Sequence, residues 1–345
     1  MPMRNYALSW LPAVLALCVI APARADEVKE AWTPTATMLR AEAAGISLPQ
    51  QIAGLALSKS GEASKGGEGV DNYAQYLSED GAIQATVYVY LPSYADASLA
   101  AYMTDKAIAE RFGSKTRRTA YGTVAAGGRP ETAIRAIYDD AADGALSTGA
   151  AFIHAGRWLV KLRITGPTER REAVVAGLDG MISALRFDDA AALHRTKAAS
   201  FAACPAGESA TNARLSAEHA EGLAQISIQP DGQDVLCVRG QIQTAEGSYD
   251  MLQKAGADDS AVIVPVDDMG TVLAFDRPRS GQGYQLSIHS VGQTDLYGVY
   301  DRIPSAQQIA AILDGRDPQT AQAKSTAAYA ASGEVTVRAG DARDR

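Results

Sequence analysis

Apolar and polar side chains alternate most clearly between Trp158 and Thr165. A period of two predicts a β-strand with one buried face. Residues 150–154 just before it are largely apolar as well, and Ala155-Gly156-Arg157 between the two runs is short enough for a hairpin turn. We therefore expect two antiparallel strands in the middle of the chain.

Two stretches change to the helical spacing of three or four residues. After Gly166 and Pro167, the apolar stripe consists of Val174, Leu178, Met181 and Leu185. Residues 98–112 have the same property, and their stripe consists of Leu99, Met103 and Ala107. Each pattern predicts a helix with one face packed on a sheet.

Further alternating runs predict the sheet on which these helices lie. The most β-like run is IQATVYVYL at residues 83–91, paired across Asp80-Gly81 with residues 73–77. Weaker strands are expected at 119–126 and 131–139, and residues 37–44 are expected as a short helix. Because short turns join neighbouring strands, the sequence predicts an α+β domain over residues 26–190, with a mostly antiparallel sheet covered by two helices.

A second group of strands follows an Ala-rich linker at residues 191–200. It predicts a smaller, β-rich α+β domain over residues 201–315, with short helices at 249–255 and 305–313. The expected strands are 224–228, 235–243, 261–266, 271–275, 284–290 and 296–300. From residue 316 to 345 the chain is polar, Ala-rich and aperiodic, which predicts a disordered tail.

The element order of residues 45–187 resembles the PsbP/Mog1-like modules of secreted bacterial proteins. The resemblance rests on the IQATVYVYL strand with its following helix, and on the GRWLVKLRITG strand with its closing helix. Modules of this type share no catalytic motif. The resemblance therefore implies a binding or assembly role and transfers no site residue.

The first 25 residues have the features of a signal peptide. Arg4 precedes an apolar run at residues 7–20, and Ala23-Arg24-Ala25 fits the rule for a cleavage site; an uncleaved anchor is the alternative. The chain carries a net charge of −8, and loss of Arg4 and Arg24 makes it −10. This acidic balance argues against a nucleic-acid partner. We expect a periplasmic or secreted protein without stable membrane insertion.

Two cysteines, Cys204 and Cys237, follow the expected leader. In an oxidising compartment such a pair usually forms a disulfide. A redox or metal-binding pair is the alternative, but the two cysteines form no C-x-x-C motif and no histidines cluster near them. We expect a structural disulfide.

Residues that could carry catalysis are scattered, and this predicts no metal, no cofactor and no enzymatic activity. The histidines stand singly, at 154, 194, 219 and 289, without the H-E-x-x-H pattern of zinc enzymes. Asp139, Asp140 and Asp143 precede Gly144, but Ala141 takes a position that a calcium loop gives to an oxygen ligand, so an acidic hairpin turn is preferred. The alternative is a hydrolase with a dispersed active site between the domains, in which a Ser or Asp contacts a histidine.

Aromatic residues concentrate in the first domain, at Tyr73, Tyr76, Tyr88, Tyr90 and Trp158. If some of them share an outward sheet face, they form a ligand or partner patch. Packing beneath the helices is the alternative. The function expected is therefore a non-catalytic protein that binds an envelope protein or a small molecule, with a purely structural envelope component as a third possibility.

Overall fold

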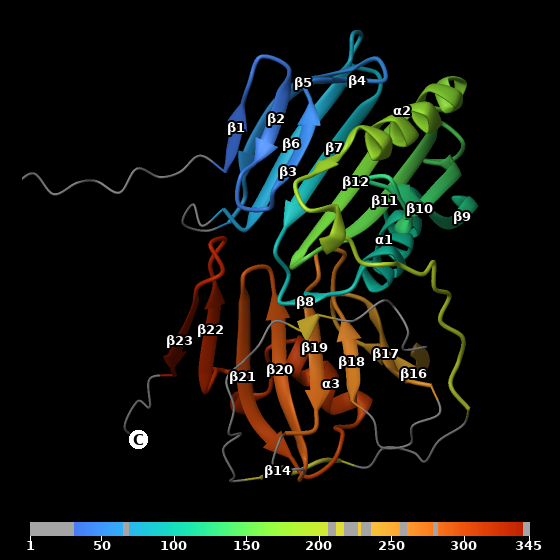
Figure 1. Cartoon of the computed structure of the whole chain (residues 1–345). Coiled ribbons are helices and arrows are strands. Elements are labelled where there is room, and N and C mark those ends of the chain that lie inside the picture. Colours follow the sequence, from blue (N-terminus) through green and yellow to red (C-terminus); the bar gives the residue numbers. More distant parts are fainter. Residues whose placement is uncertain are drawn as a thin grey trace, which may run out of the picture.

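A computed structural model of the chain describes residues 31–64, 69–205, 212–216, 227–228, 236–255, 261–278 and 282–340. The predicted signal peptide lies outside the described residues, as does most of the strand expected at 224–228. The described chain contains two large antiparallel sheets, one in the N-terminal half and one in the C-terminal half (Figure 1). None of its helices combines the length and the apolar character needed to cross a membrane.

The N-terminal sheet has eight strands. In spatial order they are β4 (Gln51–Ile52), β5 (Leu55–Glu62), β6 (Asp71–Ser78), β7 (Gln84–Tyr90), β12 (Trp158–Pro167), β11 (Leu146–Ala155), β10 (Arg129–Ala141) and β9 (Arg117–Ala126). The predicted hairpins 73–77/83–91 and 150–154/158–165 are confirmed as β6–β7 and β11–β12. The centre of the sheet is therefore formed where the sequence alternates most clearly.

The two faces of this sheet are covered differently. Helix α2 (Arg171–Ala184), after the single turn η1 (Thr168–Arg170), packs on one face together with a small sheet. The strands of the small sheet are β1 (Trp32–Pro34), β2 (Met38–Ala41), β3 (Ile46–Pro49) and β13 (Arg186–Phe187). Helix α1 (Ala97–Phe112), capped by Asp96, lies on the other face over β10 and β11.

The expected mostly antiparallel α+β fold is therefore confirmed at a coarse level, but the chain is more β-rich than a sheet covered by two helices. The helix expected at 37–44 is also wrong, because these residues contain strand β2. Leu39 and Ala41 are buried against the main core, and pairing with β1 and β3 satisfies the backbone of β2. Tertiary pairing thus overrides a short local helical pattern.

The C-terminal sheet follows the chain order along one path. Its strands are β16 (Leu236–Gln243), β17 (Ser248–Lys254), β18 (Val262–Pro265), β19 (Val272–Asp276), β20 (Tyr284–Ser290), β21 (Gln293–Tyr300), β22 (Ser325–Tyr329) and β23 (Val335–Ala339). Helix α3 (Ala306–Leu313) has a capping box formed by Ser305 and Gln308, and Ile309 and Ile312 join the core of this half. Two short elements of this half are β14 (Leu215–Ser216), which pairs with β21, and η3 (Pro318–Thr320). The short η2 (Ala190–Ala192) follows β13 in the N-terminal half.

Two expectations for this half are wrong. Residues 249–255 lie largely in strand β17 rather than in a helix, because β16 and β18 pair with it on both sides. Residues 325–339 form β22 and β23 rather than part of a disordered tail. β22 pairs with β21, and its Ala327 and Tyr329 are buried, so backbone pairing and these two side chains compensate for a polar sequence.

Cys204 and Cys237 are joined by the expected disulfide, with Cα atoms 4.9 Å apart. The bridge ties the segment that leaves the N-terminal half to strand β16. The halves also meet through β15 (Ser227–Ile228), which pairs in parallel with β8 (Tyr94–Ala95). Backbone bonds add to this contact, from Ser93 N to Ser290 O at 3.0 Å and from Gly292 N to Leu91 O at 2.8 Å.

Candidate ligand-binding face

The five predicted aromatic residues lie on two different faces of the N-terminal sheet. Tyr76 and Trp158 belong to the core beneath α2 and the small sheet, and Tyr76 donates a hydrogen bond to Pro49 O at 3.0 Å. Tyr73, Tyr88 and Tyr90 point to the opposite face, because side chains alternate along each strand. Tyr90 is fully buried there, so the face leaves only Tyr73 and Tyr88 partly exposed.

Tyr73 and Tyr88 belong to a larger polar surface on β6, β7 and β12. Tyr73 pairs with Tyr88 across the strands, and the adjacent row on the same face is Gln75, Thr86 and Arg163. Directly opposite side chains of such rows lie about 5 Å apart at Cβ. We call the set of Tyr73, Gln75, Thr86, Tyr88 and Arg163 the open face; all five are partly exposed.

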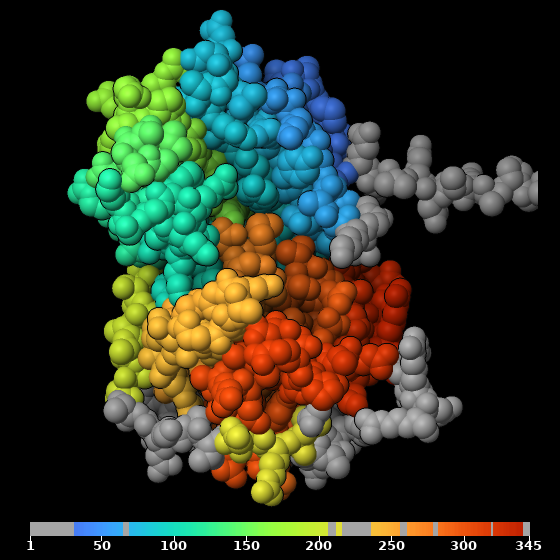
Figure 2. Space-filling model, turned by 180° about the vertical axis from the view of Figure 1, so that it is seen from behind, coloured from blue at the N-terminus to red at the C-terminus, as the bar shows by residue number. Residues whose placement is uncertain are grey.

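Helix α1 explains why this half of the sheet surface is uncovered. It packs mainly over β10 and β11, and on β7 its cluster includes the buried Tyr90, at the end of that strand. Figure 2, which shows the molecule from the α1 side, has the blue strands of the N-terminal half uncovered beside the turquoise helix. The turn between β18 and β19 approaches from the C-terminal half, and its Met269 packs against the same cluster as Tyr88 and Tyr90.

A buried ion pair lies between the open face and the C-terminal half. Lys161 Nζ is 2.6 Å from Asp268 Oδ2, and Thr104 Oγ1 of α1 donates to the same oxygen at 3.1 Å. Lys161 Nζ also lies 5.5 Å from the centre of the Tyr88 ring. Burial lowers the pKa of Lys161. Burial opposes ionisation of Asp268 too, but the positive charges of Lys161 and Arg163 hold its pKa below the usual value.

Arg163, two residues from Lys161, makes a much looser contact with Asp268 than Lys161 does. Its guanidinium Nη1 is 3.8 Å from Asp268 Oδ2, which is too long for a hydrogen bond, and its buried Nε has no hydrogen-bond partner among the described residues. The side chain is 18 % exposed, and burial lowers its pKa. A partly exposed guanidinium that lacks a close hydrogen bond to its nearest carboxylate is suited to a carboxylate or phosphate of a ligand.

Sequence reasoning did not single out Arg163. In the sequence, Lys161 and Arg163 are simply the polar positions of an alternating strand. The available signal was two cations, two residues apart, on the strand that forms the middle of the sheet. The two side chains differ because Lys161 forms a close ion pair with Asp268 and Arg163 does not. Asp268 lies more than a hundred residues further along the chain.

The contact that a dispersed hydrolase site requires is present at His289, but it is buried between the halves. Ser93 Oγ lies 3.2 Å from His289 Nδ1, and Ser287 Oγ lies 3.0 Å from Nε2. Ser93 donates its proton to Gln293 O at 2.7 Å, so its hydroxyl is engaged as a donor elsewhere. His289 is 4 % exposed, and burial lowers its pKa to about 4. The bonds of Ser93 to His289 and Gln293 join the two halves, and the hydrolase alternative stays a prediction.

His154 stacks on His194, with ring centres 4.1 Å apart. Burial, followed by the nearby His194, lowers the pKa of His154 to about 3, and its Nε2 has no hydrogen-bond partner among the described residues. His194 Nε2 contacts Gly156 O at 3.1 Å. The stack thereby fixes the segment after α2 to the end of β11. His219 lies outside the described residues.

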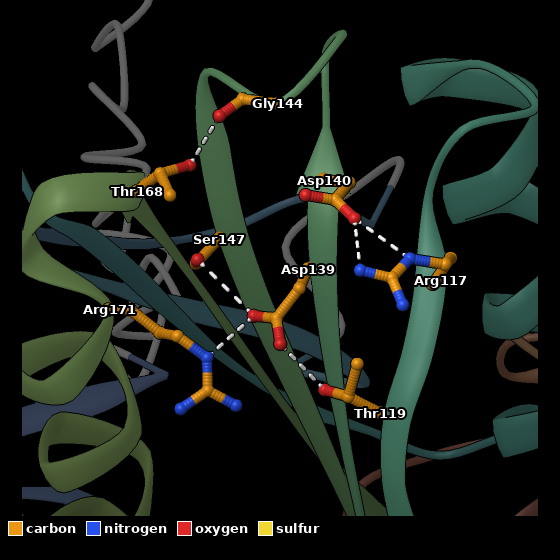
Figure 3. A network of polar contacts seen from close by, with 8 residues as sticks. All are labelled: Arg117, Thr119, Asp139, Asp140, Gly144, Ser147, Thr168 and Arg171. Carbon is orange, nitrogen blue, oxygen red and sulfur yellow. Dashed lines mark hydrogen bonds and ion pairs between the residues drawn. The ribbon is translucent and has the colours of Figure 1, made fainter.

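The acidic run at residues 139–143 spans the end of β10 and the turn to β11: Asp139 and Asp140 belong to the strand and Asp143 to the turn of the expected hairpin. Asp139 accepts bonds from Arg171 Nε at 2.8 Å and from Thr119 Oγ1 at 2.9 Å (Figure 3). Asp140 contacts Arg117, and Asp143 contacts Lys115 at 3.1 Å. Each carboxylate therefore has its own cation, and no group of three or more metal-ligating side chains gathers in the described chain.

A hollow of about 510 Å³ lies at another edge of the N-terminal sheet. β9, β10 and the segment 195–198 line it, with Gly122, Thr123, Glu131, Arg195, Thr196, Lys197 and Ala198. Glu131 and Arg195 form an ion pair with each other there. Because Glu131 and Arg195 neutralise one another and no aromatic side chain lines the hollow, it is a weaker candidate than the open face.

Comparison with known proteins adds no guide to these sites, since no protein-family model, curated protein or solved structure matches the chain.

Proposed function

We propose that this protein is a non-catalytic binding protein of the cell envelope, periplasmic or secreted, and that its open face takes a ligand carrying a carboxylate. The observation that carries the proposal is Arg163, a guanidinium that is 18 % exposed on this face and whose Nη1 lies 3.8 Å from Asp268 Oδ2, too far for a hydrogen bond. The exposed part of the guanidinium can bind a ligand carboxylate in a charge-assisted pair, because its contact with Asp268 is too long for a hydrogen bond.

The neighbours of Arg163 favour a ligand with a planar apolar part. Tyr88 lies on the next strand, one position along the same face, and Tyr73 pairs with Tyr88. Tyrosine rings offer a broad apolar contact at a low entropic cost, together with a hydroxyl that can hydrogen-bond. Gln75 and Thr86 add polar groups in the same row as Arg163. An aromatic carboxylate, free or at the surface of an envelope protein, matches this arrangement.

The compartment is inferred from two features of the chain. The Cys204–Cys237 disulfide is typical of an oxidising compartment. The apolar run at residues 7–20, followed by Ala23-Arg24-Ala25, fits a leader for export. The PsbP/Mog1-like order of elements, in which a binding or assembly role is usual, supports the same function.

The experiment compares benzoate with benzamide, which has the same shape without the charge. We expect benzoate to raise the melting temperature of the full chain and to bind measurably by calorimetry, with benzamide much weaker. Arg163→Gln should lower benzoate affinity about 10- to 100-fold, because a charge-assisted hydrogen bond contributes roughly 1.5–3 kcal/mol. Tyr88→Ala should also weaken binding.

Arg117→Gln is the matched control, because Arg117 lies at the far edge of the same sheet, where it pairs with Asp140. It should bind benzoate like the unmodified chain. Equal binding of benzoate and benzamide, or full benzoate binding by Arg163→Gln, would contradict the proposal.

A further inference from the structure

β23 is the last strand of the C-terminal sheet, and among the described residues it pairs with β22 alone (Figure 1). All five of its residues are exposed. Val335 and Val337 are 46 % and 43 % exposed, and they are the exposed large hydrophobic residues of the described chain. Natural edge strands usually carry charged side chains, proline or a bulge that prevents pairing; the segment VTVRA has no proline and no bulge, and its one charged residue is Arg338.

The pairing with β22 determines which backbone groups point outward. Ala330 N bonds Glu334 O at 2.9 Å, and Gly340 N bonds Lys324 O at 2.7 Å. In an antiparallel ladder the bonded residues alternate, so even-numbered residues of β23 direct their N–H and C=O groups to β22. The N–H and C=O groups of Val335, Val337 and Ala339 therefore face the open edge.

The strand is complementary to a second copy of itself. An antiparallel pair centred on Val337 places Val337 opposite Val337 of the second copy and Val335 opposite Ala339 of the second copy. All three residues have outward backbone groups, so each of these pairs can exchange both of its hydrogen bonds. Their side chains share one face and form a continuous apolar stripe.

The opposite face of this pair is complementary in charge. Thr336 lies opposite Arg338 of the second copy, and Glu334 lies diagonal to the same arginine, within reach of its long side chain. The two-fold axis repeats this contact, so two opposite-charge pairs flank the centre. The register centred on Val337 pairs all five residues of β23 with one another. A shift by two residues that centres the pair on Thr336 still sets Val335 opposite Val337 and Glu334 opposite Arg338 of the second copy, but it places the partners of Ala339 and Arg338 outside the strand. The pairing centred on Val337 has the isologous geometry of a closed two-fold dimer.

We propose that the edge of β23 is the surface through which two copies of this protein associate, by antiparallel pairing centred on Val337. The two sheets then become one continuous sheet across the axis. This inference rests on the C-terminal half and is independent of the open face and its ligand.

Sedimentation velocity of the full chain over a series of concentrations tests the proposal. We expect a monomer–dimer equilibrium that Val337→Pro shifts to monomer. Proline removes the outward N–H at the centre of the pair, and the N–H of residue 337 is not used by β22, so the fold is retained. Unchanged thermal unfolding of Val337→Pro shows that the sheet is intact.

A charge exchange gives a second, independent measurement. Arg338→Glu places like charges together and should weaken the dimer about tenfold or more, whereas the double variant Glu334→Arg/Arg338→Glu restores opposite charges and should recover most of the affinity. Recovery by the double variant cannot result from damage to the fold. Equal weakening in the single and double variants would contradict the proposed register.

Cross-linking checks the position of the axis. Val337→Cys places two thiols on either side of the axis at a Cα separation of about 5.5 Å, which suits a disulfide. It should give a covalent dimer under mild oxidation, and Ser332→Cys, exposed at the end of the β22–β23 hairpin, should not. A chain that stays monomeric at every concentration, or a dimer unaffected by Val337→Pro, would overturn the proposal.

Discussion

Asp268 is surrounded by polar groups of the N-terminal half, although it belongs to a turn of the C-terminal half. Lys161 and Thr104 contact its carboxylate directly, and Arg163 lies 3.8 Å away. The Lys161 side chain is 4 % exposed, so its charge has little access to water. A buried charge is tolerated only when a partner neutralises it. One carboxylate therefore stabilises both the contact between the halves and the position of the open face.

We predict that Asp268→Asn lowers the free energy of unfolding by about 3 kcal/mol, because it leaves a buried lysine without its counter-ion. Urea unfolding measures this loss. Asp143→Asn is the control, since Asp143 also pairs with a lysine but the two side chains are 82 % and 71 % exposed. It should cost less than about 1 kcal/mol. Similar losses in the two variants would show that burial of Lys161 is not important.

At the scale of elements, β22 connects the end of the chain to both halves. It pairs with β21 of the C-terminal sheet, yet Ala327 and Tyr329 belong to the core cluster of the N-terminal half. Tyr329 is 1 % exposed, and its hydroxyl donates to Thr294 Oγ1 at 3.1 Å. Arg157 of the β11–β12 turn also bonds Ala331 O at 2.9 Å. This strand thus closes the junction between the halves.

We predict that Tyr329→Ala destabilises the whole protein by about 3–5 kcal/mol, the usual cost of removing a buried aromatic ring. Tyr329→Phe, which removes only the hydroxyl, should cost about 1 kcal/mol. Chemical denaturation followed by tryptophan fluorescence compares the two, since Trp32 and Trp158 are buried in the same cluster. If Tyr329→Ala unfolds like the unmodified chain, the strand is peripheral and the prediction fails.

At the scale of the whole molecule, the two halves share a polar interface that depends on neutral histidine. His289 of the C-terminal sheet contacts Ser93 of the N-terminal half, and Tyr94 packs edge-on against its ring at 5.5 Å between ring centres. Thr294 Oγ1 is 3.3 Å from His289 Nδ1 and links it to Tyr329. Protonation would place a charge in this buried network, so acid acts against the association of the halves.

We predict that stability falls as the pH is lowered from about 6.5 to about 4. The folded pKa of His289 is about 4, below the ordinary value of 6.5, so the unfolded chain takes up the proton first. Its contribution is complete above pH 6.5 and is lost through this window, by about 3 kcal/mol. His154, with a folded pKa of about 3, adds a loss of the same sign.

Urea unfolding at several pH values measures the slope. His289→Gln cannot titrate, so its stability should fall less steeply over the same window. The difference between the two slopes isolates His289 from carboxylates such as Asp268, whose lowered pKa adds a loss only at lower pH. If stability falls equally steeply with pH in the unmodified chain and in His289→Gln, titration of His289 does not cause the loss.

Several features could be predicted from the sequence because they depend on neighbours along the chain. The alternation at residues 158–165 and 83–91, and the helical stripe at 98–112, led to β12, β7 and α1. The two cysteines led to the disulfide. For the aromatic set, the sequence showed which residues are present, but β6 turns Tyr73 and Tyr76 to opposite faces because they are three positions apart.

Only the tertiary structure decided the rest. β17 and β22 are strands because neighbouring strands pair with them, although their own sequences favour a helix or no regular structure. Lys161 and Arg163 occupy equivalent positions in the pattern, yet Asp268 forms a close ion pair with Lys161 and lies 3.8 Å from Arg163, too far for a hydrogen bond. Side-chain period is a property of the local backbone, and it fixes which faces are apolar. Backbone pairing and charge neutralisation join residues far apart in sequence, so they exist only once the chain has folded.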